Sequence, residues 1–512
     1  MNHRIAAPLI TLFAISACGL SSQAAPRTSA PPATTPSPSA TSKPSTADQD
    51  TRPALAQTRS TKTENLKVEV VGLNRVKSKH LVVQLRLTNT GSEKLPWTGE
   101  MGDNTRPLGE IRWASGIGVL DAQAHSWILP YQPAGSPCLC SDQDRDGLGY
   151  FIEPGKSISL YAVMPAPSGN PSTTTVVTPV GPPMTDVPIS DDPPVTPSGM
   201  TIPDPDAEPV TTVTRRLVTP SESLDKSEET ADDGRDLQVN LSSDVLFAVN
   251  KATLTPKAKA VLARTAKLID ASAGATVKVA GHADSSGNNA INDPLSTRRA
   301  QAVRQALSAL VTRQGVGFQA KGYGSRRPLY GNDTDEGKRR NRRVTVTFAK
   351  PQSPASAAPA TTVTPGATGL TGTGQADGQP ISMEITGLRR LPGGLGLLTY
   401  RIENQGAGEA WFNELHHARD WMSFKYQAAS NVTLTDVAAR RQYLPARLQV
   451  ADDKGGFDSY CACTDVSGVR LNTEKFGPGQ QREFWSLFAL PEAATTLKVK
   501  IGSFRDLQVP IQ

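Results

Sequence analysis

The sequence has few aromatic residues and no apolar run long enough to cross a bilayer. Phe, Trp and Tyr make up 5% of the 512 residues, whereas 41 are Pro and 42 are Gly. We therefore expect long parts of the chain to be linkers rather than packed core. The apolar run at residues 5–17 is shorter than the roughly 20 residues that a transmembrane helix needs. A chain of this length is expected to hold three or four units.

Catalytic motifs are also missing from the sequence. It has no Ser-His-Asp arrangement, no HExxH motif and no phosphate-binding loop. The six histidines are scattered along the chain. We therefore predict that the protein is not an enzyme, that it has no cofactor and that it holds no metal.

The first 18 residues have the layout of a secretory signal. Arg4 precedes the apolar run, which gives a signal peptide at residues 1–17. The stretch ISAC, ending at Cys18, resembles a bacterial lipobox, in which cleavage precedes a cysteine that carries diacylglycerol. The alternative is an ordinary signal peptide with an incidental cysteine. Small residues before Cys18 favour lipidation, which would hold the mature chain on a membrane outside the cytoplasm.

Three stretches have the composition of linkers. The first is a disordered tether rich in Ser, Thr and Pro, the second carries 12 acids against 4 bases, and the third is rich in Ala, Thr, Gly and Pro. These stretches are residues 18–64, 191–236 and 351–379. They separate three predicted domains, at residues 65–190, 237–350 and 380–512.

The first and last of these domains are copies of one sequence. VEVVGLNR at residues 68–75 matches MEITGLRR at residues 383–390, and the offset of 315 residues persists over many later positions. Both copies contain alternating apolar stretches separated by Gly, Pro and Asn. This pattern predicts two Ig-like all-β repeats, each folded as an antiparallel sandwich.

Each repeat also has two cysteines separated by one residue, Cys138 with Cys140 and Cys461 with Cys463. Thiols outside the cytoplasm tend to oxidise. Side chains two residues apart on a strand share a face, near the upper Cα separation that a disulfide allows. We therefore predict two local, somewhat strained disulfides. Metal binding is the alternative, and the absence of a duplicated histidine disfavours it.

The middle domain changes its hydrophobic period. Thr255-Pro256 begins a helix with one apolar stripe, and residues 294–312 form a second helix. Alternating stretches predict strands at residues 243–249, 276–281, 316–322 and 342–348. The order βαβαββ predicts an α+β domain whose helices cover one face of a mixed sheet.

Positive charge is concentrated on this middle domain. Residues 237–350 have 19 Lys and Arg against 7 Asp and Glu, although the whole chain carries only +6. Such a surface suits a polyanion. Because secretion argues against nucleic acid, the anionic cell wall is the expected partner.

Helical geometry separates two adjacent arginines in the second helix. At about 100° per residue, Arg298 points away from the apolar stripe, whereas Arg299 lies beside the sheet. Asp284 follows directly on the strand at residues 276–281. Asp284 and Arg299 could therefore converge on one cleft, where a carboxylate and a guanidinium suit a zwitterion. Taken singly, either residue would be an ordinary turn or surface residue.

At these residues the sequence resembles the C-terminal peptidoglycan-binding domain of outer membrane protein A. The same domain occurs in peptidoglycan-associated lipoproteins and flagellar motor stators. The motif extends over GHAD (281–284), Gly287, Asn292, LS (295–296), RA (299–300) and NRRV (341–344). The resemblance implies binding of the diaminopimelate in a wall stem peptide, with Asp284 holding its amine and Arg299 its carboxylate. It also implies that Asn292, Arg342 and Asn250 line the groove.

Two positions depart from the family pattern. Ala283 replaces the usual Thr before the acid, and Lys338 replaces a usual Arg. Neither change removes one of the two main charged partners. The β-repeats resemble modules of lipoproteins from high-GC Gram-positive bacteria, especially at SPCLCSD (136–142).

The sequence therefore predicts a lipid-anchored envelope protein that ties a membrane to peptidoglycan. The membrane would be the outer membrane if the producer has one, and otherwise the outer face of the cytoplasmic membrane. The alternative is an envelope assembly protein whose β-repeats bind a protein partner, with the middle domain only docking it to the wall.

Overall fold

The structure is a computed structural model. It describes residues 50–103, 112–351, 370–416, 424–425, 427–452, 456–464 and 475–512. All of these lie in one compact unit, Ala47–Gln512. The predicted signal peptide and Cys18 lie outside the described residues. Within the described part of the chain, no helix is both long and apolar enough to span a membrane.

The first repeat consists of two antiparallel layers around a shared apolar core. One layer has the order β1-β2-β3-β8, comprising Ala56–Arg59, Leu66–Val76, His80–Asn89 and Ser157–Pro165. The other has the order β10-β9-β5-β6, comprising Met184–Pro188, Thr173–Val177, Gly118–Asp121 and Ser126–Pro133. Strands β4 (Leu95–Pro96) and β7 (Phe151–Ile152) form a short pair. Strand β1 lies in residues that we predicted as part of the tether, so this repeat begins earlier than expected.

The second repeat has a matching four-stranded layer, β17-β18-β19-β24. Its strands are Thr371–Ala376, Gln379–Leu391, Leu395–Asn404 and Gln481–Ala489. The remaining strands are β20 (Val432–Asp436), β21 (Arg441–Tyr443), β22 (Arg447–Ala451), β23 (Phe457–Cys461), β25 (Thr496–Ile501) and β26 (Leu507–Pro510). Two 3-10 turns, Pro392–Gly394 and Asn413–His416, complete it. Strand β17 falls in the predicted linker 351–379, which is therefore shorter than expected.

The two repeats share irregular details as well as strands. The pairing of β2 with β3 shifts register between Val70 and Gly72, and that of β18 with β19 shifts between Ile385 and Gly387. These positions are 315 residues apart, the offset found in the sequence. A β-bulge at the same place in both copies supports a common ancestor for the two domains. The Ig-like assignment stays a prediction.

The predicted acidic linker, residues 191–236, contains two strands. Strand β11 (Val210–Ser223) pairs in turn with β6, with β22 and β21, and with β12 (Glu228–Asp232). We predicted a linker because acids outnumber bases in this stretch, and we assumed that these acids are exposed to solvent. Glu222, Glu228 and Glu229 are instead buried and paired with arginines.

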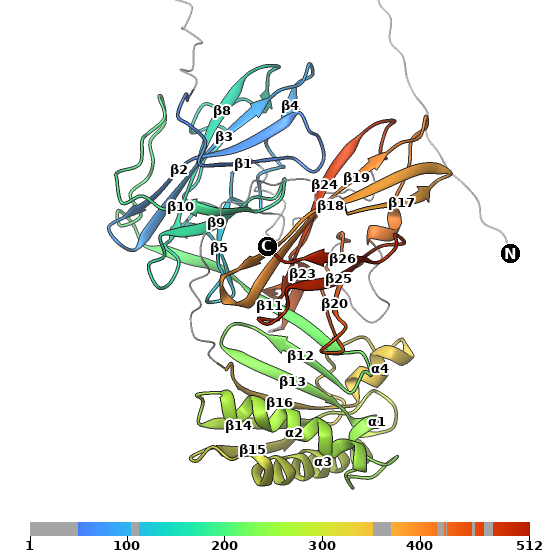
Figure 1. Ribbon diagram of the computed structural model, residues 1–512. Helices are drawn as coiled ribbons and strands as arrows, with labels where there is room; N and C mark the ends of the chain where they lie inside the picture. Colours follow the sequence, from blue (N-terminus) through green and yellow to red (C-terminus); the bar gives the residue numbers. More distant parts are fainter. Residues whose placement is uncertain are drawn as a thin grey trace, which may run out of the picture. The chain divides into compact units, whose positions relative to one another are not determined.

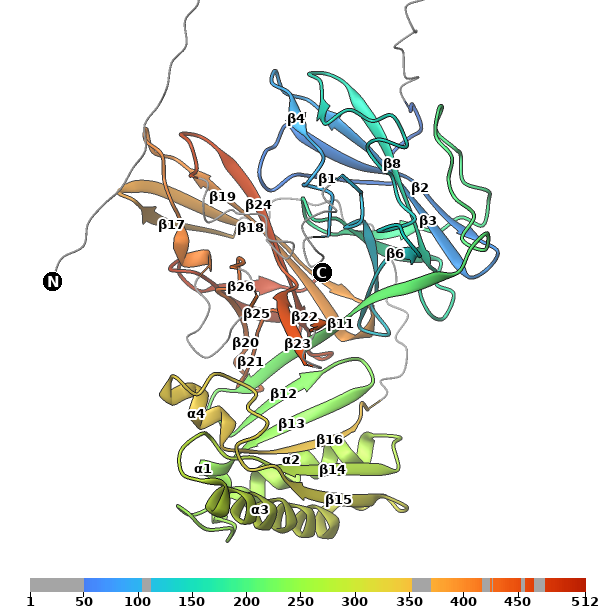
Figure 2. The same cartoon turned by 180° about the vertical axis from the view of Figure 1, so that it is seen from behind.

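The middle domain has a mixed sheet with helices on one face (Figures 1 and 2). Its strands are β13 (Asp236–Ser242), β14 (Thr276–Gly281), β15 (Gly317–Gly322) and β16 (Arg343–Ala349), in the order β13-β16-β14-β15. Strands β14 and β15 are parallel, and the other pairs are antiparallel. The helices are α1 (Ser243–Leu246), α2 (Pro256–Ala271), α3 (Asn289–Leu310) and α4 (Asp335–Asn341). Apolar side chains of α2 and α3 form the core with those of the sheet.

Two elements of this domain differ from the prediction. Residues 243–249 begin with the short helix α1 instead of forming a strand, because β13 has already paired with β16 through residue 242. Helix α3 begins at Asn289 rather than at residue 294, because the side chain of Asn288 accepts the N–H of Ile291 as an N-cap. Pro294 therefore lies inside the helix.

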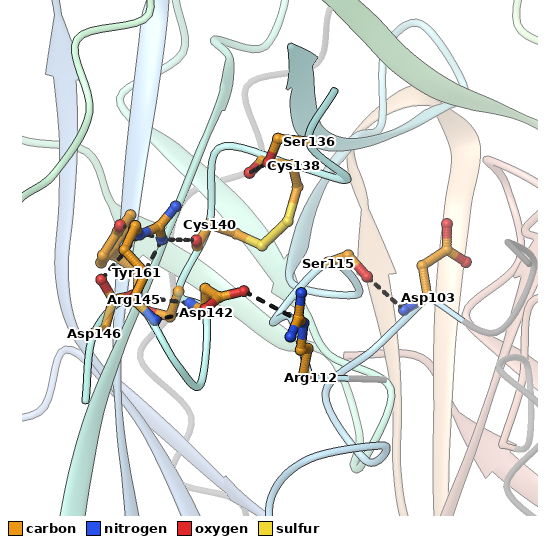
Figure 3. The surroundings of a disulfide bond; sticks show 11 residues. Asp103, Arg112, Ser115, Ser136, Cys138, Cys140, Asp142, Arg145, Asp146 and Tyr161 are labelled. Carbon is orange, nitrogen blue, oxygen red and sulfur yellow. Dashed lines mark hydrogen bonds and ion pairs between the residues drawn. A yellow bond between two sulfur atoms is a disulfide. The ribbon is translucent and has the colours of Figure 1, made fainter. Parts of the chain in front are cut away.

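Disulfide bonds join Cys138 to Cys140 and Cys461 to Cys463 in the structure. The Cα atoms are 5.3 and 5.2 Å apart, in the middle of the usual range and not at its upper end. Beside the first bond, the guanidinium of Arg145 donates to the carbonyl of Cys140, to Asp146 and to the hydroxyl of Tyr161 (Figure 3).

Candidate functional site

The candidate site begins where β14 ends against α3. A Cβ on Gly281 would come within 2.0 Å of the carbonyl oxygen of Ser296, so only glycine lets the strand and the helix approach this closely. The next turn carries Asp284, which is buried, with only 6% of its surface exposed. Its Oδ1 accepts the N–H of Ser286 at 2.9 Å. The turn therefore holds the carboxylate in one orientation.

Helix α3 places its two adjacent arginines in different surroundings. Arg298 is exposed, whereas Arg299 is 8% exposed, as the helical phase predicts. The Nε of Arg299 donates to the carbonyl of Lys251 at 3.0 Å, and its guanidinium lies 5.1 Å from the ring centre of Phe247. Burial lowers the pKa of Arg299 from its usual value, the charge of Asp244 opposes this, and nearby Arg342 lowers the pKa further. A ligand carboxylate would relieve both effects.

Arg342 connects two acids on opposite sides of the site. Its Nη1 lies 2.7 Å from Oδ2 of Asp284, while its Nε and Nη2 contact the two carboxylate oxygens of Asp244 at 3.0 and 2.7 Å. The hydrogen bonds that Arg342 donates to Asp244 are the main reason that the pKa of Arg342 is raised. Asp244 is exposed and was missed by our sequence analysis. An acid in the first turn of a helix could have indicated Asp244, but we had assigned residues 243–249 to a strand.

The structure gives the five predicted binding residues different surroundings. No ion pair joins Asp284 to Arg299 among the described residues, and Arg342 is the cation that contacts Asp284. Asn292 is buried and donates to the carbonyl of Ser286, so it braces the turn that carries Asp284. Asn250 is exposed, with a φ of 58°, one residue before Lys251. The ligand contacts of all five stay predictions.

The site combines two carboxylates, Asp244 and Asp284, with two guanidiniums, Arg299 and Arg342. This set can hold ammonium and carboxylate groups together. His282, the nearest histidine in the chain, is buried and stacks on Tyr323, and burial lowers its pKa to about 3. It is therefore neutral at physiological pH. Within the described ranges, no three His, Cys, Asp or Glu residues are arranged to hold a metal ion.

Known proteins resemble the part of the chain that contains these residues. A model of the OmpA family matches residues 246–342. Probable lipoprotein YiaD of Escherichia coli is 35% identical over 119 residues, which are 23% of this chain and 52% of YiaD. Outer membrane porin F of Pseudomonas aeruginosa is 37% identical over 106 residues, 21% of this chain and 30% of the porin. The peptidoglycan-binding protein ArfA of Mycobacterium tuberculosis is 35% identical over 102 residues, 20% of this chain and 31% of ArfA.

Among solved structures, the cell wall anchor of the T6SS from Pseudomonas aeruginosa is 30% identical. That match covers 25% of this chain and 90% of the anchor, with a TM-score of 0.23. The chain spans only about half of YiaD and about a third of the porin and of ArfA. The resemblance of the β-repeats to lipoprotein modules stays a prediction. Residues 246–342 are therefore a domain of the OmpA family, and the family resemblance of the sequence is confirmed for this part of the chain.

Proposed function

We propose that this protein binds peptidoglycan non-covalently through the diaminopimelate of its stem peptides. One observation carries the proposal. The two Nη groups of Arg299 have no hydrogen-bond partner among the described residues, although the side chain is buried. Asp244 interacts with the charge of Arg299 only over a longer distance, so a ligand carboxylate that accepts directly from the Nη groups would stabilise this partly desolvated guanidinium.

The other end of the ligand meets an acidic side of the site. The carboxylate of Asp284 accepts from the N–H of Ser286 and from Arg342, which fixes its orientation towards an ammonium group. The free end of diaminopimelate carries an amine and a carboxylate on one carbon. Arg299 and Asp284 would each take one of these groups. ArfA, which is similar to this chain over this domain, is a peptidoglycan-binding protein, and this supports peptidoglycan as the polymer.

Co-sedimentation of the full chain with insoluble wall tests this function. A soluble stem peptide that contains diaminopimelate should displace the protein, whereas the same peptide with lysine, whose side chain ends in an amine without a carboxylate, should not. Binding should also persist in moderate salt, because short-range paired contacts are screened less than a diffuse field. Equal displacement by the two peptides would rule out the proposed role of Arg299.

We further propose that a lipid on Cys18 anchors the chain, so that the protein ties a membrane to the wall. The lipobox-like ISAC stretch and the relation to a probable lipoprotein support this anchor. Labelled fatty acid should be incorporated by the wild type and not by Cys18→Ala. Equal labelling of both proteins would show that the lipid is elsewhere or absent.

A further inference from the structure

A buried cluster of charged residues lies behind the candidate site, at α4. The side chain of Arg340 is 4% exposed and contacts three carboxylates. Its Nη2 bonds to Glu222, its Nη1 lies 2.8 Å from Glu229, and its Nε lies 3.0 Å from Glu336. Glu336 belongs to α4 itself. Glu222 and Glu229 belong to β11 and β12, which precede the family-matched residues 246–342.

The hairpin β11–β12 therefore lies outside the family-matched residues and contacts α4 through Arg340. Burial by itself would lower the pKa of Arg340, but Glu229 and Glu222 outweigh it and raise the pKa above its usual value. Tyr330 adds a hydroxyl that donates to Glu229, and Gln442 of β21 donates to Glu222. Buried charges persist only while their partners stay within hydrogen-bond reach. The cluster thus fixes the distance between the hairpin and α4.

The same short helix carries Arg342 into the site. Arg342 follows the last residue of α4, its N–H donates to the carbonyl of Lys338 at 3.0 Å, and its carbonyl accepts the N–H of Ser243 at 2.9 Å. Residues 340 and 342 are about 200° apart around a helix axis. One guanidinium therefore points to the hairpin and the other points to Asp244 and Asp284.

A second set of bonds joins α4 to the turn that carries Asp284. Asn341 is completely buried, and its Oδ1 accepts the N–H groups of Leu329 and Tyr330. Its Nδ2 donates to Oδ1 of Asn332 at 3.0 Å. The same oxygen of Asn332 accepts the N–H of Ser285 at 3.1 Å, directly after Asp284. A shift of α4 would therefore move both sides of the site.

We propose that Arg340 is a positioning residue for the wall-binding site, through which the β11–β12 hairpin holds α4 and hence Arg342 in place. This inference rests on the proposed function. It assigns a role in wall binding to a strand pair that the family match does not include.

The experiment compares two adjacent arginines of α4 in the full chain. Arg340→Met removes the cluster's central cation. Arg339→Met is the matched control, because Arg339 also pairs with Glu336 but reaches the hairpin only through a 3.3 Å bond to the carbonyl of Lys226 and contacts neither Glu222 nor Glu229. Affinity for a soluble diaminopimelate stem peptide should fall roughly 3- to 30-fold in Arg340→Met and stay within about twofold in Arg339→Met.

A double-mutant cycle shows whether Arg340 acts through Arg342. In an Arg342→Ala background, Arg340→Met should cause little further loss of affinity. An equal loss in both backgrounds would show that Arg340 acts on folding in general and would overturn the proposal. If Arg340→Met does not fold, Glu222→Gln removes one charge of the cluster with little change in shape and should give the same pattern with a smaller loss.

A measurement without ligand separates this inference from the proposed function. Hydrogen exchange over residues 335–343 should become faster in Arg340→Met and in Glu222→Gln, and should be unchanged in Arg339→Met. Faster exchange with no peptide binding by the wild type would contradict the wall-binding function while leaving the positioning of α4 intact. Unchanged exchange in the first two variants would refute the positioning role, whatever the wild type binds.

Discussion

Replacing each of two adjacent arginines in α3 should have very different effects on wall binding. Arg298→Ala and Arg299→Ala remove the same charge from the same helix. Arg298 is exposed, whereas Arg299 is 8% exposed and lies beside Phe247, with both Nη groups available to a ligand. We expect Arg299→Ala nearly to abolish binding and Arg298→Ala to change it little.

The size of the contrast follows from the two environments. Removing one partner of a buried, hydrogen-bonded charge pair costs about 2–5 kcal/mol, or roughly 30- to 5,000-fold in affinity. An exposed charge that acts only through solvent contributes at most about 1 kcal/mol, which is roughly fivefold. Arg299→Ala also loses the bond to the carbonyl of Lys251, which is worth about 1–2 kcal/mol of folding stability. Thermal unfolding must therefore be measured alongside binding.

Co-sedimentation with insoluble wall, repeated over a range of salt concentrations, measures both variants. If bulk charge holds the wall, the two variants should lose affinity equally and binding should disappear as salt rises. Equal losses would refute the assignment of Arg299, and a stronger loss in Arg298→Ala would refute the orientation of α3.

Three further predictions concern the same chain. Burial lowers the pKa of His282 to about 3, so the unfolded chain binds the proton more tightly than the folded chain does. The free energy of unfolding should therefore fall as pH drops from 6.5 towards 3, by about 2 kcal/mol at pH 5. Urea unfolding at pH 7 and pH 5 measures this fall, and an equal fall in His282→Gln would disprove the assignment to His282. Gly281→Ala should cost about 1–3 kcal/mol and weaken wall binding, because a Cβ would clash with the carbonyl of Ser296; unchanged urea unfolding would contradict this close approach. Metal-free, non-reduced protein should show no alkylation of Cys138, Cys140, Cys461 or Cys463, and four modified thiols would contradict the two disulfides.

Local signals in the sequence predicted part of the middle domain well. Thr255 before Pro256 marks the start of α2, and its side chain accepts the N–H of Ala258 in the structure. The phase of α3 predicted that Arg298 is exposed and Arg299 buried. Both results depend only on neighbouring residues, because a cap and a helical face are set within one or two turns.

Long-range pairing was not predictable in the same way. The hairpin β11–β12 has the acidic composition of a linker, and Glu222 and Glu229 are favourably buried only beside Arg340, which is more than 100 residues away in the sequence. The contact of Arg342 with Asp244 joins residues 98 apart, so neither spacing nor helical phase could reveal it. The family resemblance indicated Arg342 and Asp284 as site residues, but it revealed neither the ion pair between them nor Asp244.

The most direct test of the account is a calorimetric titration of stem peptide into the full chain. A peptide containing diaminopimelate should bind to the wild type, and the same peptide with lysine in its place should bind at least tenfold more weakly, since it leaves Arg299 without a carboxylate. Asp284→Ala should nearly abolish heat from the diaminopimelate peptide, because the ligand amine loses its partner. If the two peptides bind equally, or if Asp284→Ala binds as tightly as the wild type, the zwitterion site between Asp284 and Arg299 is wrong.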